Sequence, residues 1–75
     1  MKVLAKLKEK NSKLEGEKIV LLLWEKGNGI EYSVHTEIVK TGEYIFGHYF
    51  NDFWDDKSLE NALKFYNDYE KNYFL

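Results

Sequence analysis

The dipeptide Asn28-Gly29 constrains this 75-residue chain more than any other feature, because it separates two stretches that both favour β-strands. Asn-Gly between such stretches is the strongest short-range signal for a β-hairpin. Before it, residues 19–24 form a continuous apolar run that is too short for a typical helix. After it, apolar and polar side chains alternate, which is typical of a half-buried strand. We therefore predict antiparallel strands over 18–26 and 30–39.

The flanking segments predict one more strand and two helices. Residues 43–50 follow a turn at 40–42 and alternate as a third strand. Residues 2–14 carry leucines at helical spacing and end before Gly16, which predicts a first helix. A second helix is expected from a cap at Asp55 or Asp56 to about Tyr73. The predicted fold class is α+β in the order α-β-β-β-α: a three-stranded antiparallel meander with two helices on one face.

The predicted turns decide which side chains share a face of the sheet. A two-residue turn at Asn28-Gly29 pairs Lys26 with Glu31 and avoids opposing Glu25 to Glu31, since like charges directly opposite are destabilising. A three-residue second turn places Gly42 in the left-handed conformation. The helix-covered face would then carry Ile19, Leu21, Leu23, Tyr32, Val34, Ile38, Tyr44, Phe46 and Phe50. The opposite face would carry Val20, Leu22, Trp24, Ile45 and Tyr49 beside Ser33, His35 and Glu37.

Composition excludes several classes of function. The length supports one small domain over residues 1–75, and the absence of cysteine excludes a disulfide framework and a thiolate metal site. No run is long enough to cross a membrane and no secretory signal is visible, so we expect a cytoplasmic protein without a membrane partner. No catalytic motif or zinc-ligand spacing occurs, and we expect a protein that is not an enzyme and binds no cofactor or metal.

An exposed aromatic and acidic surface is the strongest functional signal. Two helices on one face cannot hide a strand that is apolar on both sides, and large exposed apolar patches mark binding sites. Tryptophan and tyrosine are enriched at binding hot spots. The predicted partner-binding residues are Trp24, Leu22, Ile45, Tyr49, Phe53, Trp54, Asp55 and Asp56.

These residues predict a non-enzymatic protein-interaction module. It would be an inhibitor or regulator that docks on a larger protein with a basic or nucleic-acid-binding surface. In size and composition, though in no motif, the chain is similar to small phage and mobile-element regulators and inhibitors, anti-CRISPR proteins among them.

Two alternatives stay open. The first is a nucleic-acid-binding accessory protein. The α-β-β-β-α order resembles that of double-stranded-RNA-binding domains, which implies phosphate contacts from basic residues, and an aromatic sheet face is similar to single-strand-binding platforms. Asp55-Asp56 stands where that family has a lysine cluster, so Lys6 and Lys10 of the first helix would be the nucleic-acid-binding residues. The other alternative is a structural homodimer, formed through an apolar edge strand or the face that carries Trp24.

Overall fold

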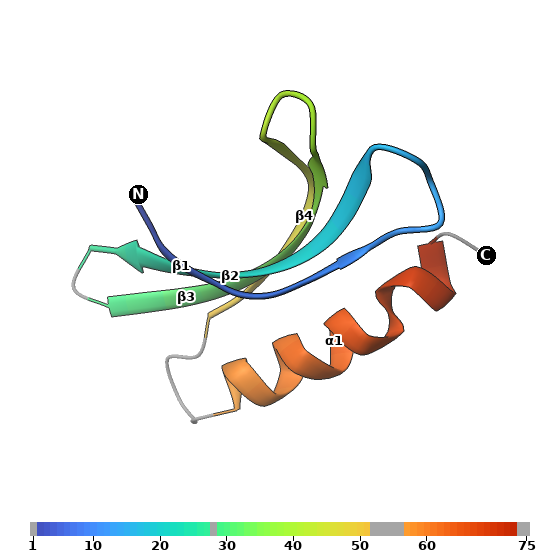
Figure 1. Ribbon diagram of the computed structural model, residues 1–75. Helices are drawn as coiled ribbons and strands as arrows, with labels where there is room; N and C mark the ends of the chain where they lie inside the picture. Colours follow the sequence, from blue (N-terminus) through green and yellow to red (C-terminus); the bar gives the residue numbers. More distant parts are fainter. Residues whose placement is uncertain (1, 28, 52–56, 74–75) are drawn as a thin grey trace.

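Four strands and one helix make up the fold in the computed structural model, which describes residues 2–27, 29–51 and 57–73 (Figure 1). The strands are β1 (Lys2–Asn11), β2 (Glu17–Lys26), β3 (Gly29–Ile38) and β4 (Glu43–Phe50), and helix α1 spans Ser58–Tyr73. The strands pair in chain order as one antiparallel sheet. The three predicted strands and the second helix are confirmed, with small differences at their ends.

The predicted helix over residues 2–14 is wrong, because this segment is the edge strand β1. Leu4 and Leu7 have the three-residue spacing of a helix, but each is an extra residue at a shift in register against β2. The two β-bulges are three residues apart, so the leucines at these positions have the spacing expected of a helix. β1 also pairs the second edge of β2, whose buried backbone N–H and C=O groups need partners on both sides.

The order is therefore β-β-β-β-α, and the three-stranded meander with two helices on one face is wrong. Within the described residues, a single helix packs on one face of the four-stranded sheet, against β2, β3 and β4. The resemblance to double-stranded-RNA-binding domains depended on a first helix, so it does not hold. The apolar strand β2 lies between β1 and β3, which removes the apolar edge strand proposed for a homodimer.

The first hairpin keeps the predicted faces although its turn is displaced. Lys26 pairs with Gly29 instead of Glu31, and Gly27 adopts a positive φ of 56° in the turn. The pairing is thus shifted by two residues from the predicted register. Because side chains alternate with a period of two, such a shift leaves each of them on its predicted face.

The second turn is one residue longer than predicted and exchanges the faces of two side chains. Gly42 has the predicted left-handed conformation, with φ of 75°. Ile38 pairs with Glu43, so the turn holds four residues instead of three. Tyr44 therefore lies on the face away from α1 and Ile45 on the face toward it, which reverses the prediction.

A bulge in the middle of β4 restores the predicted register. The pairing with β3 shifts opposite His35, where Phe46 and Gly47 face one residue of β3. Beyond this point Tyr49 and Phe50 return to their predicted faces. The bulge thus corrects the slip that the longer turn introduces.

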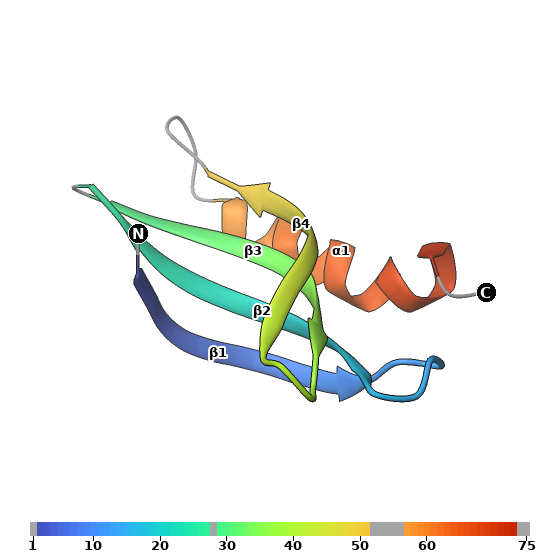
Figure 2. The same cartoon turned by 90° about the horizontal axis from the view of Figure 1, so that it is seen from above.

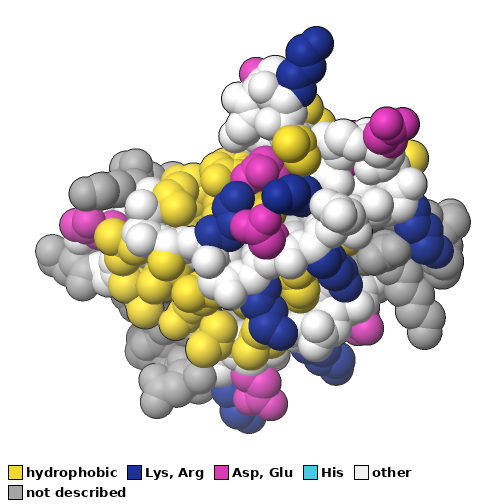
Figure 3. All heavy atoms as spheres, in the orientation of Figure 1, with side chains coloured by type: hydrophobic (Ala, Val, Ile, Leu, Met, Phe, Trp, Pro, Cys, Tyr) yellow, Lys and Arg dark blue, Asp and Glu magenta, His cyan; other side chains and the backbone are white. Residues whose placement is uncertain are grey.

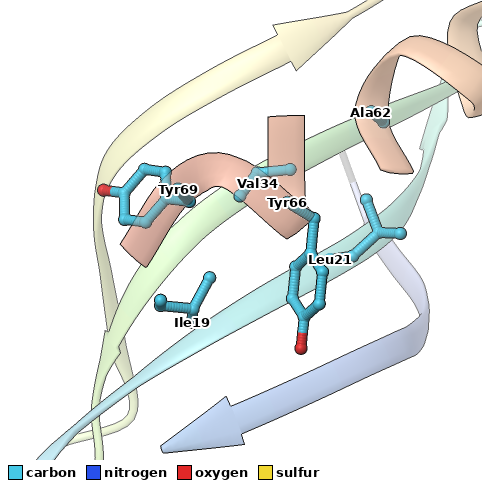
Figure 4. Packing of buried hydrophobic residues seen from close by; sticks show 6 residues of the cluster. All are labelled: Ile19, Leu21, Val34, Ala62, Tyr66 and Tyr69. Atoms are coloured by element: carbon cyan, nitrogen blue, oxygen red, sulfur yellow. The ribbon is translucent and has the colours of Figure 1, made fainter. Parts of the chain in front are cut away.

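The hydrophobic core lies between α1 and the sheet. The helix presents buried residues at positions i, i+4 and i+7, which form one stripe on an α-helix. The helix contributes Ala62, Tyr66 and Tyr69, and the sheet contributes Ile19, Leu21 and Val34 (Figure 4). At one end of the core, Oγ1 of Thr36 lies 3.1 Å from the phenol oxygen of Tyr69, and both side chains are buried.

We expect Tyr69→Phe to lower the free energy of unfolding by about 1–3 kcal/mol, because it removes the partner of a buried hydroxyl on Thr36. Urea unfolding would measure the change. The double variant Tyr69→Phe/Thr36→Val removes both polar groups, so it should recover most of the loss. A single variant as stable as the parent protein would contradict the assigned hydrogen bond.

Candidate functional site

The sheet face away from α1, called here the outer face, is packed by the chain's own side chains. The sheet is strongly curved, and the hairpin of β3 and β4 rises on the side opposite α1 (Figure 1). Val20 and Leu22 of β2 point to this side and have no exposed surface. Leu22 was predicted to contact a partner, but it is inaccessible in the folded chain.

A row of four buried polar side chains follows β3 on the outer face. These are the alternate residues Glu31, Ser33, His35 and Glu37, each with at most 9% of its surface exposed. The rings of Trp24, Tyr44 and Tyr49 surround His35, with centroids 5.3 to 6.1 Å from its own. The outer face is therefore a second packed layer with polar groups at its base.

Among the described residues, one of the two ring nitrogens of His35 has a hydrogen-bond partner and the other has none. Its Nε2 lies 2.8 Å from Oγ of Ser33, and the indole Nε1 of Trp24 donates a hydrogen bond to the same oxygen. Within the described residues, Nδ1 of His35 is buried without a hydrogen-bond partner. Burial lowers the pKa of His35 below its ordinary value of 6.5, and charge repulsion from His48 adds a smaller lowering. The fold thus favours the neutral imidazole.

Gly47 makes room for this imidazole. A Cβ atom at position 47 would lie 2.4 Å from Cε1 and 2.7 Å from Nδ1 of His35. No side chain fits there without moving the ring or β4. No role for Gly47 was predicted, although an isolated glycine within a strand is a known indicator of a bulge or a close backbone approach.

An ion-pair network crosses the edge of the outer face. Nζ of Lys6 lies 2.8 Å from Glu37 and 3.5 Å from Glu9, and Nζ of Lys18 lies 2.8 Å from Glu9. The hydrogen bond to Glu37 raises the pKa of Lys6, and the hydrogen bond from Lys18 lowers the pKa of Glu9. These lysines have carboxylate partners already.

The two lysines predicted to bind nucleic acid lie on opposite faces of β1. Lys6 pairs with Glu37 on the outer face. Lys10 lies on the helix side, with Nζ 5.0 Å from the ring centroid of Tyr66. They therefore do not form one phosphate-binding site.

Two exposed aromatic side chains on β4, Phe46 and Tyr49, form what we call the β4 ridge. Their exposed fractions are 69% and 54%. Phe46 is also the one described non-glycine residue with a positive φ, at 53°. This conformation costs a bulky side chain about 1–2 kcal/mol, and the exposed ring gains little from burial. The folded chain therefore holds Phe46 at a position that does little for its own core.

The other predicted binding residues are dispersed. Trp24 is partly buried in the outer layer, and Ile45 pairs with Thr36 on the helix side. Phe53, Trp54, Asp55 and Asp56 lie outside the described residues. Of the described residues of the predicted surface, Tyr49 is the one left largely exposed. Phe46 is exposed as well, but its ring was expected in the core and was therefore not predicted to bind a partner.

Neither a metal centre nor a membrane span occurs in the described part of the chain. No three histidine, aspartate or glutamate side chains there are placed to hold a metal ion. The one helix described is not long and apolar enough to cross a bilayer. Comparison with protein-family models, curated proteins and solved structures finds no significant match to the chain.

Strain at Phe46 can be measured through stability. We expect Phe46→Gly to raise the free energy of unfolding by up to about 1 kcal/mol, because glycine adopts a φ of 53° without steric cost. The gain is limited by the greater freedom of glycine in the unfolded chain. Phe46→Ala keeps the strain and serves as the control. Equal stability of the two variants in urea would contradict a strained backbone.

Stability should fall as pH decreases from about 7.5 to 5.5. The folded state lowers the pKa of His35. Above the unfolded pKa of about 6.5, the imidazole is neutral in both states and the stability is complete. Below it, the unfolded state binds the proton more readily than the folded state, so the free energy of unfolding falls. His35→Gln removes the titrating group and should flatten this part of the profile. Urea unfolding across the range tests it, and an equal slope in both proteins would contradict the assignment to His35.

Proposed function

We propose that this protein is a non-enzymatic protein-binding module that docks the β4 ridge onto a larger protein. The observation that carries the proposal is Phe46, a large aromatic side chain that is strained in its backbone and 69% exposed. Backbone strain that the fold maintains tends to cluster at functional sites. Exposed aromatic rings of this size are also typical anchors of protein interfaces.

The two edges of the sheet support this choice. β1 carries lysines at positions 2, 6, 8 and 10 and two bulges, which are devices that prevent pairing with another strand. β4 also has a bulge, but it has no lysine and no proline, and it exposes Phe46 and Tyr49. A partner that binds through aromatic contact therefore finds it on β4.

A foreign protein is favoured over a nucleic acid or a second copy of the chain. Lys6 is held by Glu37 and Glu9, so its charge is already matched. The apolar strand β2 is central, and its outer-face residues Val20 and Leu22 are buried. The first feature removes Lys6 from the nucleic-acid alternative, and the second removes the apolar edge strand from the homodimer alternative.

We expect Phe46→Ala and Tyr49→Ala each to weaken partner binding by about 30-fold, which corresponds to the roughly 2 kcal/mol of a hot-spot residue. The partner would be captured from nuclease-treated native lysate, and dissociation constants would then be measured by calorimetry. Ile30→Ala is the matched control, because Ile30 is 53% exposed and lies at the β2–β3 turn.

The expected result is loss of binding in the two ridge variants and an unchanged constant for the control. Thermal melts would confirm that all three variants fold. Capture that disappears after nuclease treatment, or an equal loss in Ile30→Ala, would contradict the proposal.

A further inference from the structure

α1 leaves one strand of the sheet uncovered. The helix packs against β2, β3 and β4, whereas β1 lies at the opposite edge (Figure 2). Ala5, Lys8 and Lys10 of β1 pair with Leu23, Leu21 and Ile19 of β2. Since Leu21 and Ile19 belong to the core beneath the sheet, these three β1 side chains lie on the helix side. We call the region beneath β1 and beside α1 the β1 wedge.

The strand that borders the β1 wedge carries exposed apolar side chains. Figure 3 views the molecule from the β1 edge and shows an apolar area that continues from the sheet toward the helix. Leu4 and Leu7, the two bulge residues of β1, have 47% and 43% of their surface exposed. Ala5 and Leu23 are only partly buried. This edge therefore offers apolar contact to another molecule.

Two lysines at the wedge differ from the other described lysines near this edge. Lys6 and Lys18 are bound to carboxylates. Lys8 and Lys10 make no ion pair within the described residues, and their Nζ atoms lie 5.9 and 5.0 Å from the centroid of the same Tyr66 ring. Two like charges over one ring repel each other. A carboxylate placed between them would be attracted by both.

The occupant must use side chains rather than backbone. The bulges at Leu4 and Leu7 interrupt the outer ladder of β1, and its lysines oppose strand addition. A helix needs no hydrogen bonds from the sheet, and helices pack side by side on one face of a sheet in α+β folds. We propose that the β1 wedge binds an acidic amphipathic helix of a partner protein, with its apolar stripe on Leu4 and Leu7 and its carboxylates at Lys8 and Lys10.

The probe is a fluorescent synthetic peptide of about 18 residues, with leucines at i, i+3, i+4 and i+7 and glutamates on its polar face. A second peptide carries lysines in place of the glutamates. Fluorescence anisotropy at low and high salt measures binding to the full chain. We expect the acidic peptide to bind at least 10-fold more tightly than the basic one, and more weakly as salt rises.

Variants locate the site. Leu7→Ser and the pair Lys8→Glu/Lys10→Glu should each weaken binding of the acidic peptide at least 10-fold. The controls are Leu14→Ser and Lys13→Glu, which make the same kinds of substitution in the turn after β1 and should stay within two-fold of the parent protein. Phe46→Ala should also leave peptide binding unchanged. Absence of peptide binding would therefore not contradict the proposal for the β4 ridge, and absence of binding at the ridge would not contradict the proposal for the β1 wedge.

Four results would overturn the proposal: no binding of the acidic peptide, equal binding of both peptides, equal loss in the control variants, or association with anionic lipid vesicles in place of the peptide. The last result would assign the wedge to a membrane surface. Circular dichroism melts of every variant separate loss of binding from loss of folding.

Discussion

The fold depends on β2, a strand whose side chains are apolar on both faces and which must therefore be buried from both sides. Ile19 and Leu21 meet α1, while Val20 and Leu22 point the other way, and all four are completely buried. Both edges of β2 are paired as well, by β1 and β3. A segment that needs partners in four directions fixes the positions of every other element. An apolar side chain left in water, or a buried backbone group left without a hydrogen bond, would weaken folding.

Covering the outer face of β2 without a second helix explains the unusual features of β3 and β4. The rings of Trp24, Tyr44 and Tyr49 close over this face, and His35 stands between them. The imidazole fits because Gly47 presents no side chain to it. Gly47 reaches that position through the bulge of β4, and the same bulge places Phe46 in its strained and exposed conformation. The β4 ridge is thus linked to the burial of β2.

Local signals in the sequence predicted three strands, two turns and the second helix, because apolar runs, alternation and glycines act over a few residues. The first strand was missed because Leu4 and Leu7 are bulge residues, and bulges depend on pairing between segments distant in sequence. The faces of Tyr44 and Ile45 were exchanged by one extra turn residue, which local patterns do not specify. The same limit applied to the site: Leu22 was expected at a surface that the curved sheet closes.

The width of the sheet explains why β1 is left uncovered. Strands lie about 4.8 Å apart and a helix with its side chains is about 10 Å wide, so one helix covers two or three strands. A fourth strand then has one face in solvent unless another element packs there. β1 carries lysines at that place and bulges along its edge, and both features oppose pairing with another strand. The apolar residues it still exposes, Leu4 and Leu7, therefore do not serve the sheet, and this is the physical reason to look for a partner at this edge.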